Sequence, residues 1–213
     1  MQKWVLASYY TVGTVYEKVF AEHLGKSLEK FPFIQKEIYT PQPRGSWNKN
    51  LVIKPEIILR TLQLLPPDKL GVLYTDADSE LWEYPELIDR IQLIDNPPVD
   101  IAFHVLDHDS WYGKTNHQKE EFCGTMYIRN SPQMQAFVKR WYELCAADTR
   151  IWEPHWFKKT LEEFRPTLSI TELPLEYAYI TSLPDGRKPL VDVKKPVICH
   201  FQASRTCKQK VQA

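Results

Sequence analysis

The chain has 213 residues, which suits one domain with a substantial core, so we expect a single domain over residues 1–213. Hydrophobic residues make up 43% and charged residues 25%, an ordinary globular composition that argues against both disorder and a membrane span. Lys plus Arg and Asp plus Glu both total 27, so the formal net charge is +0 and the molecule as a whole does not attract nucleic acid.

The cysteines and the N-terminal sequence indicate the cellular compartment of the protein. The four cysteines show no C-x-x-C spacing, which favours reduced thiols over a zinc site or disulfides. The apolar run at residues 4–10 is shorter than a signal-peptide core and is better interpreted as a strand. Both features predict a cytoplasmic protein.

The first predicted unit is a strand, a loop and a helix. An apolar run over residues 4–8 predicts a buried strand, and near-helical apolar spacing over residues 15–31 predicts the helix. In open α/β sheets, ligands bind in the crevice at the carboxyl ends of the strands. Tyr10 could stack there on a base, and Thr11 or Thr14 could form hydrogen bonds with it. The alternative is a loop that packs on its own helix.

The second unit places a lysine at a helix entrance. Residues 34–39 predict a strand, and the Pro- and Gly-containing stretch 41–47 breaks regular structure. A helix is predicted to begin at Lys54-Pro55 and to run through Leu65, since proline suits the first helical position. Lys54 could therefore meet phosphate oxygens, or it could be an ordinary solvated lysine.

The third unit contains the clearest indication of a functional site. The apolar run over residues 71–75 predicts a short strand that ends in two carboxylates, Asp76 and Asp78. Because residues two apart on a strand point to the same face, both carboxylates can converge on one cation. Such hard oxygen ligands suit Mg²⁺ or Mn²⁺, which often bind substrate phosphates as well. We expect a metal site that takes a nucleoside diphosphate, the alternative being a solvated turn.

A polar loop is predicted after the next helix and strand, which we place at residues 85–94 and 99–106. This loop, residues 104–112, is rich in histidine, aspartate and aromatic side chains. It could hold an acceptor substrate or supply an acid or base, with Asp109 as the candidate. Its spacing matches no standard zinc pattern.

The remaining elements continue the alternation of strands and helices. Gly124 lies in a predicted strand, where it marks either a bulge or a close approach of substrate to the backbone. A helix is predicted to start at Ser131-Pro132, as cap and first position. The other predicted elements are a strand at 122–128, a helix at 153–164 and strands at 168–173 and 197–201. This order predicts an α/β fold.

Read together, these segments resemble the GT-A class of nucleotide-sugar glycosyltransferases, in particular its small phage and bacterial members. The matching pieces are residues 10–17, 44–50, 54–55, 74–78, 123–127, 173–177 and 200–205, the last of which reads His-Phe-Gln-Ala-Ser-Arg. Their order and spacing carry the resemblance, which covers nearly the whole chain. It implies one Rossmann-like domain with a mixed, mostly parallel sheet flanked by helices.

The resemblance also implies roles for individual residues. The metal ligands would be Asp76, Asp78 and His200, and a neutral imidazole is a suitable addition to carboxylates for Mn²⁺. The donor-binding residues would be Tyr10, Thr11, Thr14, Lys54, Asp76 and Arg205. The first three would contact the nucleoside, Asp76 the ribose as well as the metal, and the two basic residues the diphosphate.

The implied reaction is metal-dependent transfer of a sugar from a nucleotide donor, with UDP the expected carrier, to an acceptor hydroxyl. The candidate bases are Asp109 and Glu153. Where the family often shows Asp-Gln, this chain has Glu153-Pro154, so the base and the choice between inversion and retention stay open. The acceptor could be a modified DNA base, which would suit a phage enzyme in its host's cytoplasm and a basic C-terminal tail, or a saccharide, a protein side chain or a small metabolite.

Two other classes of protein remain as alternatives. A phosphatase of the haloacid dehalogenase type also has an apolar strand that ends in Asp-x-Asp. That family usually has the motif near the N-terminus and Thr or Val two residues after the second aspartate, whereas this chain has Glu80 there. The other alternative is a binding module that keeps a nucleotide pocket without catalysis.

Overall fold

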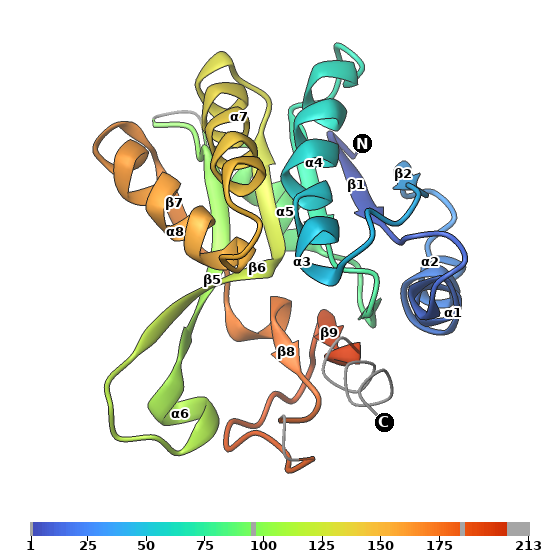
Figure 1. The fold of residues 1–213 in the computed structure, drawn as a ribbon, viewed down its shortest axis with the longest axis vertical. Helices are drawn as coiled ribbons and strands as arrows, with labels where there is room; N and C mark the ends of the chain where they lie inside the picture. The colour runs from blue at the N-terminus through green and yellow to red at the C-terminus, as the bar shows by residue number, and fades with distance from the viewer. Residues whose placement is uncertain (1, 95–96, 184–185, 204–213) are drawn as a thin grey trace.

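A six-stranded sheet forms the centre of the computed structural model, which describes residues 2–94, 97–183 and 186–203 (Figure 1). The strand order is β2-β1-β3-β6-β5-β7. The bounds are β1 Trp4–Tyr9, β2 Lys36–Tyr39, β3 Gly71–Thr75, β5 Ile101–Asp107, β6 Lys119–Arg129 and β7 Ile170–Glu172. Strand β6 pairs antiparallel with β3 and β5, and the other pairs are parallel. The predicted mixed, mostly parallel sheet is confirmed.

Helices cover both faces of this sheet (Figure 1). The α-helices are α1 Val15–Phe20, α2 Lys26–Leu28, α3 Trp47–Leu51, α4 Ile53–Leu64, α5 Glu86–Ile91, α6 His108–Tyr112, α7 Pro132–Ala147 and α8 Glu153–Phe164. A π-helical turn, η1 Ala21–Gly25, joins α1 to α2, and two 3-10 turns are η2 Arg165–Thr167 and η3 Leu175–Tyr177. The predicted start of α7 is confirmed, because the Ser131 hydroxyl accepts a hydrogen bond from the Met134 amide and Pro132 follows it.

The core has a separate cluster on each face of the sheet. On one face, Tyr74 of β3 packs in a cluster with α4, α7 and α8, and on the other face Leu73 packs with η1, α2 and α5. Every residue of β3 is buried. Strands covered on both faces are apolar throughout, which is why β1 and β3 were visible in the sequence as unbroken apolar runs.

A small second sheet was not predicted. It has the order β4-β9-β8, with β4 Ser79–Leu81, β8 Tyr179–Ile180 and β9 Ile198–His200. Strand β4 pairs antiparallel with β9, and Ser79 lies opposite His200. The C-terminal part of the chain is thereby brought next to the end of β3.

The predicted loop over residues 104–112 is wrong in part. Strand β5 continues through Asp107, and the remaining residues form the short helix α6. The Asp107 carboxylate caps this helix by accepting a hydrogen bond from the Asp109 amide, and Gly113 ends it in the left-handed region at φ 65°. The sequence signal was hidden because a five-residue helix shows too few turns for an apolar period.

Strand β6 carries a bulge in the region of Gly124. The register of β5 with β6 shifts between Phe103, which lies opposite Met126, and His104, which lies opposite Phe122. The bulge anticipated at the glycine is therefore present. Beyond it, β5, α6 and β6 form an excursion that extends below the central sheet in the view of Figure 1.

Among the helices that the structure describes, none has both the length and the apolar character needed to cross a membrane.

A substitution of Phe157, in α8, tests how much the core packing contributes to stability. Its buried ring packs edge-on against Phe103 of β5 and against Phe137 and Trp141 of α7, with centroid distances of 5.5, 5.9 and 5.0 Å. We expect Phe157→Ala to lower the free energy of unfolding by about 3 to 5 kcal/mol in urea titrations, because it leaves a cavity. Phe33, which is 65% exposed, provides the matched control, and Phe33→Ala should cost less than about 1 kcal/mol. Equal effects of the two changes would contradict this view of the core.

Candidate functional site

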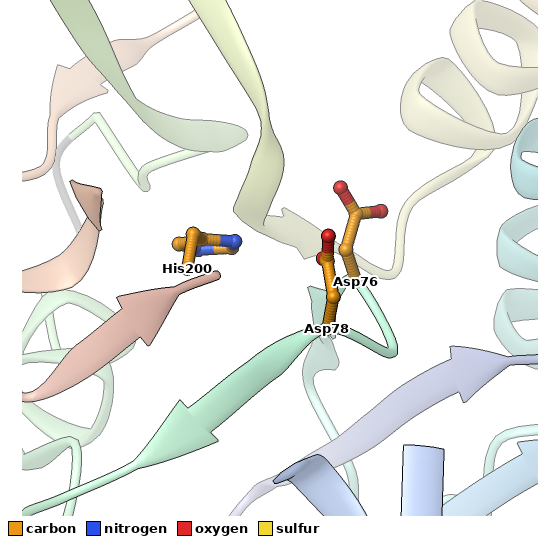
Figure 2. Close-up of side chains that lie close together, drawn as sticks. All are labelled: Asp76, Asp78 and His200. Carbon is orange, nitrogen blue, oxygen red and sulfur yellow. The ribbon is translucent and has the colours of Figure 1, made fainter. Parts of the chain in front are cut away.

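Asp76, Asp78 and His200 converge at the carboxyl end of β3 (Figure 2). Each offers one ligand atom, and these atoms lie within 4.8 Å of one another. The predicted convergence is correct, but its predicted cause is not. Strand β3 ends at Thr75, and both aspartates belong to the turn that leads into β4, so strand alternation does not align them.

The turn and the C-terminal segment hold Asp78 in place. Its carboxylate Oδ2 accepts a hydrogen bond of 2.7 Å from the Ala203 amide, and its carbonyl accepts one of 2.9 Å from the Phe201 amide. Burial, together with the neighbouring carboxylate of Asp76, raises the pKa of Asp78 to about 6. Two carboxylates brought together in this way favour a cation between them.

His200 adds a neutral nitrogen ligand to the pair. The side chain is 1% exposed, and its Nε2 lies 2.8 Å from the Thr125 hydroxyl. Burial lowers the pKa of His200 to about 4, so the imidazole is neutral at pH 7 and keeps a lone pair for a metal. A hydrogen-bonded imidazole beside two carboxylates is a donor set that suits Mn²⁺. The two carboxylates by themselves also suit Mg²⁺.

Gly124 lies directly against this cluster. A Cβ atom at this position would lie 2.4 Å from the Phe122 ring and 3.1 Å from the His200 ring. The Phe122 and His200 rings themselves pack edge-on at 4.7 Å. A glycine is therefore needed here so that the Phe122 ring can pack against His200. This requirement is separate from the expected close approach of substrate to the backbone.

A cavity of about 300 Å³ opens beside the cluster, a size within the range of small-molecule sites. It is lined by the loop after β1, by α3 and α4, by the excursion through α6, and by the start of α8. Its aromatic lining residues are Tyr9, Tyr10, Tyr16, Trp47, Tyr74, Tyr112, Phe122 and Trp152. Rings of this kind can pack on a base or on the C–H face of a sugar.

Lys54 is buried between two acidic groups. Its Nζ lies 3.1 Å from Asp76 and 3.4 Å from Glu153, and it donates a hydrogen bond of 3.2 Å to the Cys123 carbonyl. Burial alone would lower the pKa of this lysine, but the two carboxylates outweigh it and hold the pKa well above its usual value. Lys54 is a charged residue of the cavity wall.

Glu153 begins α8 and points its carboxyl group into the same network. The residue is 3% exposed, and its Oε1 is buried without a hydrogen-bond partner among residues 2–94, 97–183 and 186–203. Burial raises the pKa of Glu153 to about 7, although Lys54 acts in the opposite direction. An acid with a pKa near neutrality can accept and release a proton at physiological pH.

The structure brings together many, but not all, of the predicted site residues. Tyr10 and Thr11 line the cavity with Lys54, Asp76, Asp78 and Glu153. Thr14 instead caps α1 and bonds to Thr11, outside the cavity lining. Asp109 also lies outside it, 2.7 Å from His117. Arg205 falls outside the described residues.

Sequence reasoning missed several lining residues. Tyr74 donates a hydrogen bond of 2.8 Å to Asp76, and Tyr112, Glu120 and Trp152 complete the far wall. Trp47 belonged to the stretch 44–50 that carried the resemblance, so a signal for it existed. Tyr74 likewise belonged to the stretch 74–78, and Tyr112 to the polar loop 104–112. Glu120 and Trp152 belong to no motif, and only the fold brings them to the cavity.

Comparison with known proteins assigns the family. The family model described as nucleotide-diphospho-sugar transferase matches residues 70–213, so the chain belongs to this family. The predicted glycosyltransferase class is thereby confirmed over the haloacid dehalogenase alternative. No curated protein sequence matches the chain.

Two solved structures share the fold. One is a glycosyltransferase involved in the glycosylation of the major capsid of PBCV-1, with a TM-score of 0.63 and 15% identity over 99% of this chain and 100% of that one. The other is mouse xyloside xylosyltransferase 1 in its apo form, with a TM-score of 0.51 and 9% identity over 95% of this chain and 98% of that one. At these identities the likeness concerns the fold.

The raised pKa of Glu153 predicts a pH-dependent stability. Because its pKa is about 7 in the folded protein and 4.5 ordinarily, the folded state binds more protons between these values, and stability falls as pH rises through this window. We measure the free energy of unfolding of metal-free protein by urea titration. The value for Glu153→Gln minus the value for wild type should rise by on the order of 2 kcal/mol from pH 5 to pH 8.

Glu163, on the same helix, is the matched control. Its hydrogen bond to Arg140 lowers its pKa, so Glu163 stays ionised in both the folded and the unfolded state from pH 5 to pH 8. The difference in unfolding free energy between Glu163→Gln and wild type should therefore stay constant over this range. A wild-type minus Glu153→Gln difference that is equally flat would contradict the raised pKa.

Proposed function

We propose that this protein is a divalent-metal-dependent glycosyltransferase that takes its sugar from a nucleoside diphosphate donor, with UDP as the carrier and Mn²⁺ or Mg²⁺ as the ion. The observation that carries the proposal is the cluster of Asp76, Asp78 and His200 at the edge of an aromatic-lined cavity. A divalent ion held by these three residues supplies positive charge that stabilises a departing diphosphate.

The loop after β1 is suited to the nucleoside. Tyr10, stacked on Phe20 with ring centroids 4.7 Å apart, offers a fixed aromatic face, and Thr11 offers a hydroxyl at the cavity wall. With a base against Tyr10, the diphosphate lies toward the metal ligands and Lys54. Thr14 acts by holding Thr11 through their hydrogen bond of 2.9 Å. Arg205 is a further candidate for the diphosphate.

The chain's own residues can move the proton that the transfer requires. The acceptor oxygen forms a bond to the anomeric carbon, the bond from that carbon to the diphosphate oxygen breaks, and its electron pair leaves with the diphosphate. The acceptor proton passes to a base, and we assign this role to Glu153 because it lines the cavity and its pKa of about 7 suits a base. Lys54, 3.4 Å away, stabilises the carboxylate before it takes the proton.

Thermal unfolding with nucleotides tests the donor site. A ligand at 100 times its Kd stabilises the native state by about 2.7 kcal/mol, which raises the Tm of a chain of this size by about 5 to 10 °C. We expect UDP with Mn²⁺ to give such a shift in wild type, a chelator to abolish it, and Asp78→Asn to lose it. The shift should persist in Asp68→Asn, where an aspartate that is 66% exposed is changed in the same way.

Two results would count against the proposal. If no nucleoside diphosphate raised the Tm under any metal condition, the donor site would be refuted. If UDP bound but UDP-sugars released no UDP over hours of incubation with mixed acceptors, a binding module without catalysis would be the better description.

A further inference from the structure

The cavity has a second half, which the donor site leaves unused. This α6–α8 half consists of Leu106, Tyr112, Glu120, Phe122, Trp152 and Ile180, which come from β5, α6, β6, the residue before α8, and β8. In Figure 1, α6 lies on one side of β8 and β9, and α1, which follows the nucleoside loop, lies on the other side. The metal cluster, at the end of β9, therefore lies between the two halves.

The charges of the α6–α8 half argue against a phosphate-bearing ligand. It contributes the Glu120 carboxylate to the cavity wall. Within the described ranges 2–94, 97–183 and 186–203, the cavity lining contains one lysine or arginine, Lys54, and its charge is already balanced by Asp76 and Glu153. A carboxylate accepts hydrogen bonds and cannot donate them, so it repels a nucleic acid backbone and attracts hydroxyl groups.

The aromatic rings of this half suit a sugar. Trp152 lines the cavity with a large apolar ring, yet 52% of it is exposed to solvent. Tyr112, which is half-buried, also lines the α6–α8 half. The face of a pyranose that carries its C–H bonds is apolar and packs on such rings, while its edge carries hydroxyls. A flat apolar surface beside a hydrogen-bond acceptor matches that pattern.

Glu120 is held in a fixed position to meet those hydroxyls. Its Oε2 lies 3.0 Å from Nε2 of His108, a residue of α6 that is 6% exposed. The His108 ring also packs edge-on against Tyr112 at 5.0 Å, so one histidine positions both the carboxylate and the aromatic ring. Preorganised groups of this kind bind with a smaller entropic cost.

We propose that the α6–α8 half binds a saccharide that carries no phosphate as the acceptor, with a sugar ring on Trp152 and its hydroxyls bonded to Glu120. This inference rests on the proposed function, because it places an acceptor next to the donor site. It favours a saccharide over a DNA base as the group that is glycosylated. A DNA base would bring its phosphate backbone close to the Glu120 carboxylate.

Binding measurements with defined probes test the acceptor class. Labelled full-length protein, saturated with UDP and Mn²⁺, is applied to an array of immobilised oligosaccharides. The same protein is titrated against fluorescent single-stranded and duplex DNA in polarisation assays at about 50 mM salt, where phosphate contacts are strongest. We expect saccharide binding, and for the strongest saccharide a loss of at least tenfold in affinity in Trp152→Ala and a severalfold loss in Glu120→Gln.

Controls separate the acceptor site from the donor site. Trp82, 43% exposed and outside the cavity lining, provides the matched variant Trp82→Ala, which should bind saccharide as wild type does. All three variants should keep the thermal shift with UDP and Mn²⁺. Loss of saccharide binding with an intact UDP shift assigns the effect to the α6–α8 half.

The outcomes that overturn the inference are distinct. If DNA bound at this site and bound more tightly in Glu120→Gln, the acceptor would be a polyanion. If UDP shifted the Tm but no saccharide on the array bound, the acceptor assignment would fail and the donor site would remain. The same conclusion would follow if a saccharide bound and Trp152→Ala did not weaken its binding. Absence of the UDP shift itself would remove both proposals.

Discussion

The pairing of β4 with β9 is the constraint on which the site depends. It sets Ser79 opposite His200, and just beyond it the amides of Phe201 and Ala203 bond to the carbonyl and the carboxylate of Asp78. A histidine from the end of the chain thereby becomes a neighbour of two aspartates from its middle. The energetic cost of placing two partly buried carboxylates beside a buried histidine is offset by these hydrogen bonds and, in the proposed enzyme, by a cation.

A second buried network connects that cluster to the reaction. Lys54 lies between Asp76 and Glu153, so one ammonium group balances a proposed metal ligand on one side and the proposed base on the other. The arrangement keeps Glu153 partly protonated near neutral pH, although it lies beside a lysine, because burial outweighs the attraction. In our two proposals, the aromatic residues on one side of this network bind a nucleoside and those on the other side bind a saccharide.

Much of the fold could be predicted from the sequence because its core strands are buried on both faces. β1 and β3 are unbroken apolar runs, and α7 and α8 have clear starts at Ser131-Pro132 and Glu153-Pro154. The short elements β4, β8 and α6 could not be predicted, since two to five residues are too few to show a period. The candidate metal ligands were found through motif and resemblance. Glu120 and Trp152 belong to no motif and reach the cavity only through tertiary packing.

The most direct test of the account is a crystal structure of the protein with UDP and Mn²⁺, with diffraction data collected at the manganese absorption edge. The account predicts one strong anomalous peak between the Asp76 and Asp78 carboxylates and the His200 ring, with the diphosphate oxygens completing the coordination and the base near Tyr10. A manganese peak elsewhere, or UDP bound in the cavity without a metal at these three residues, would contradict the central claim.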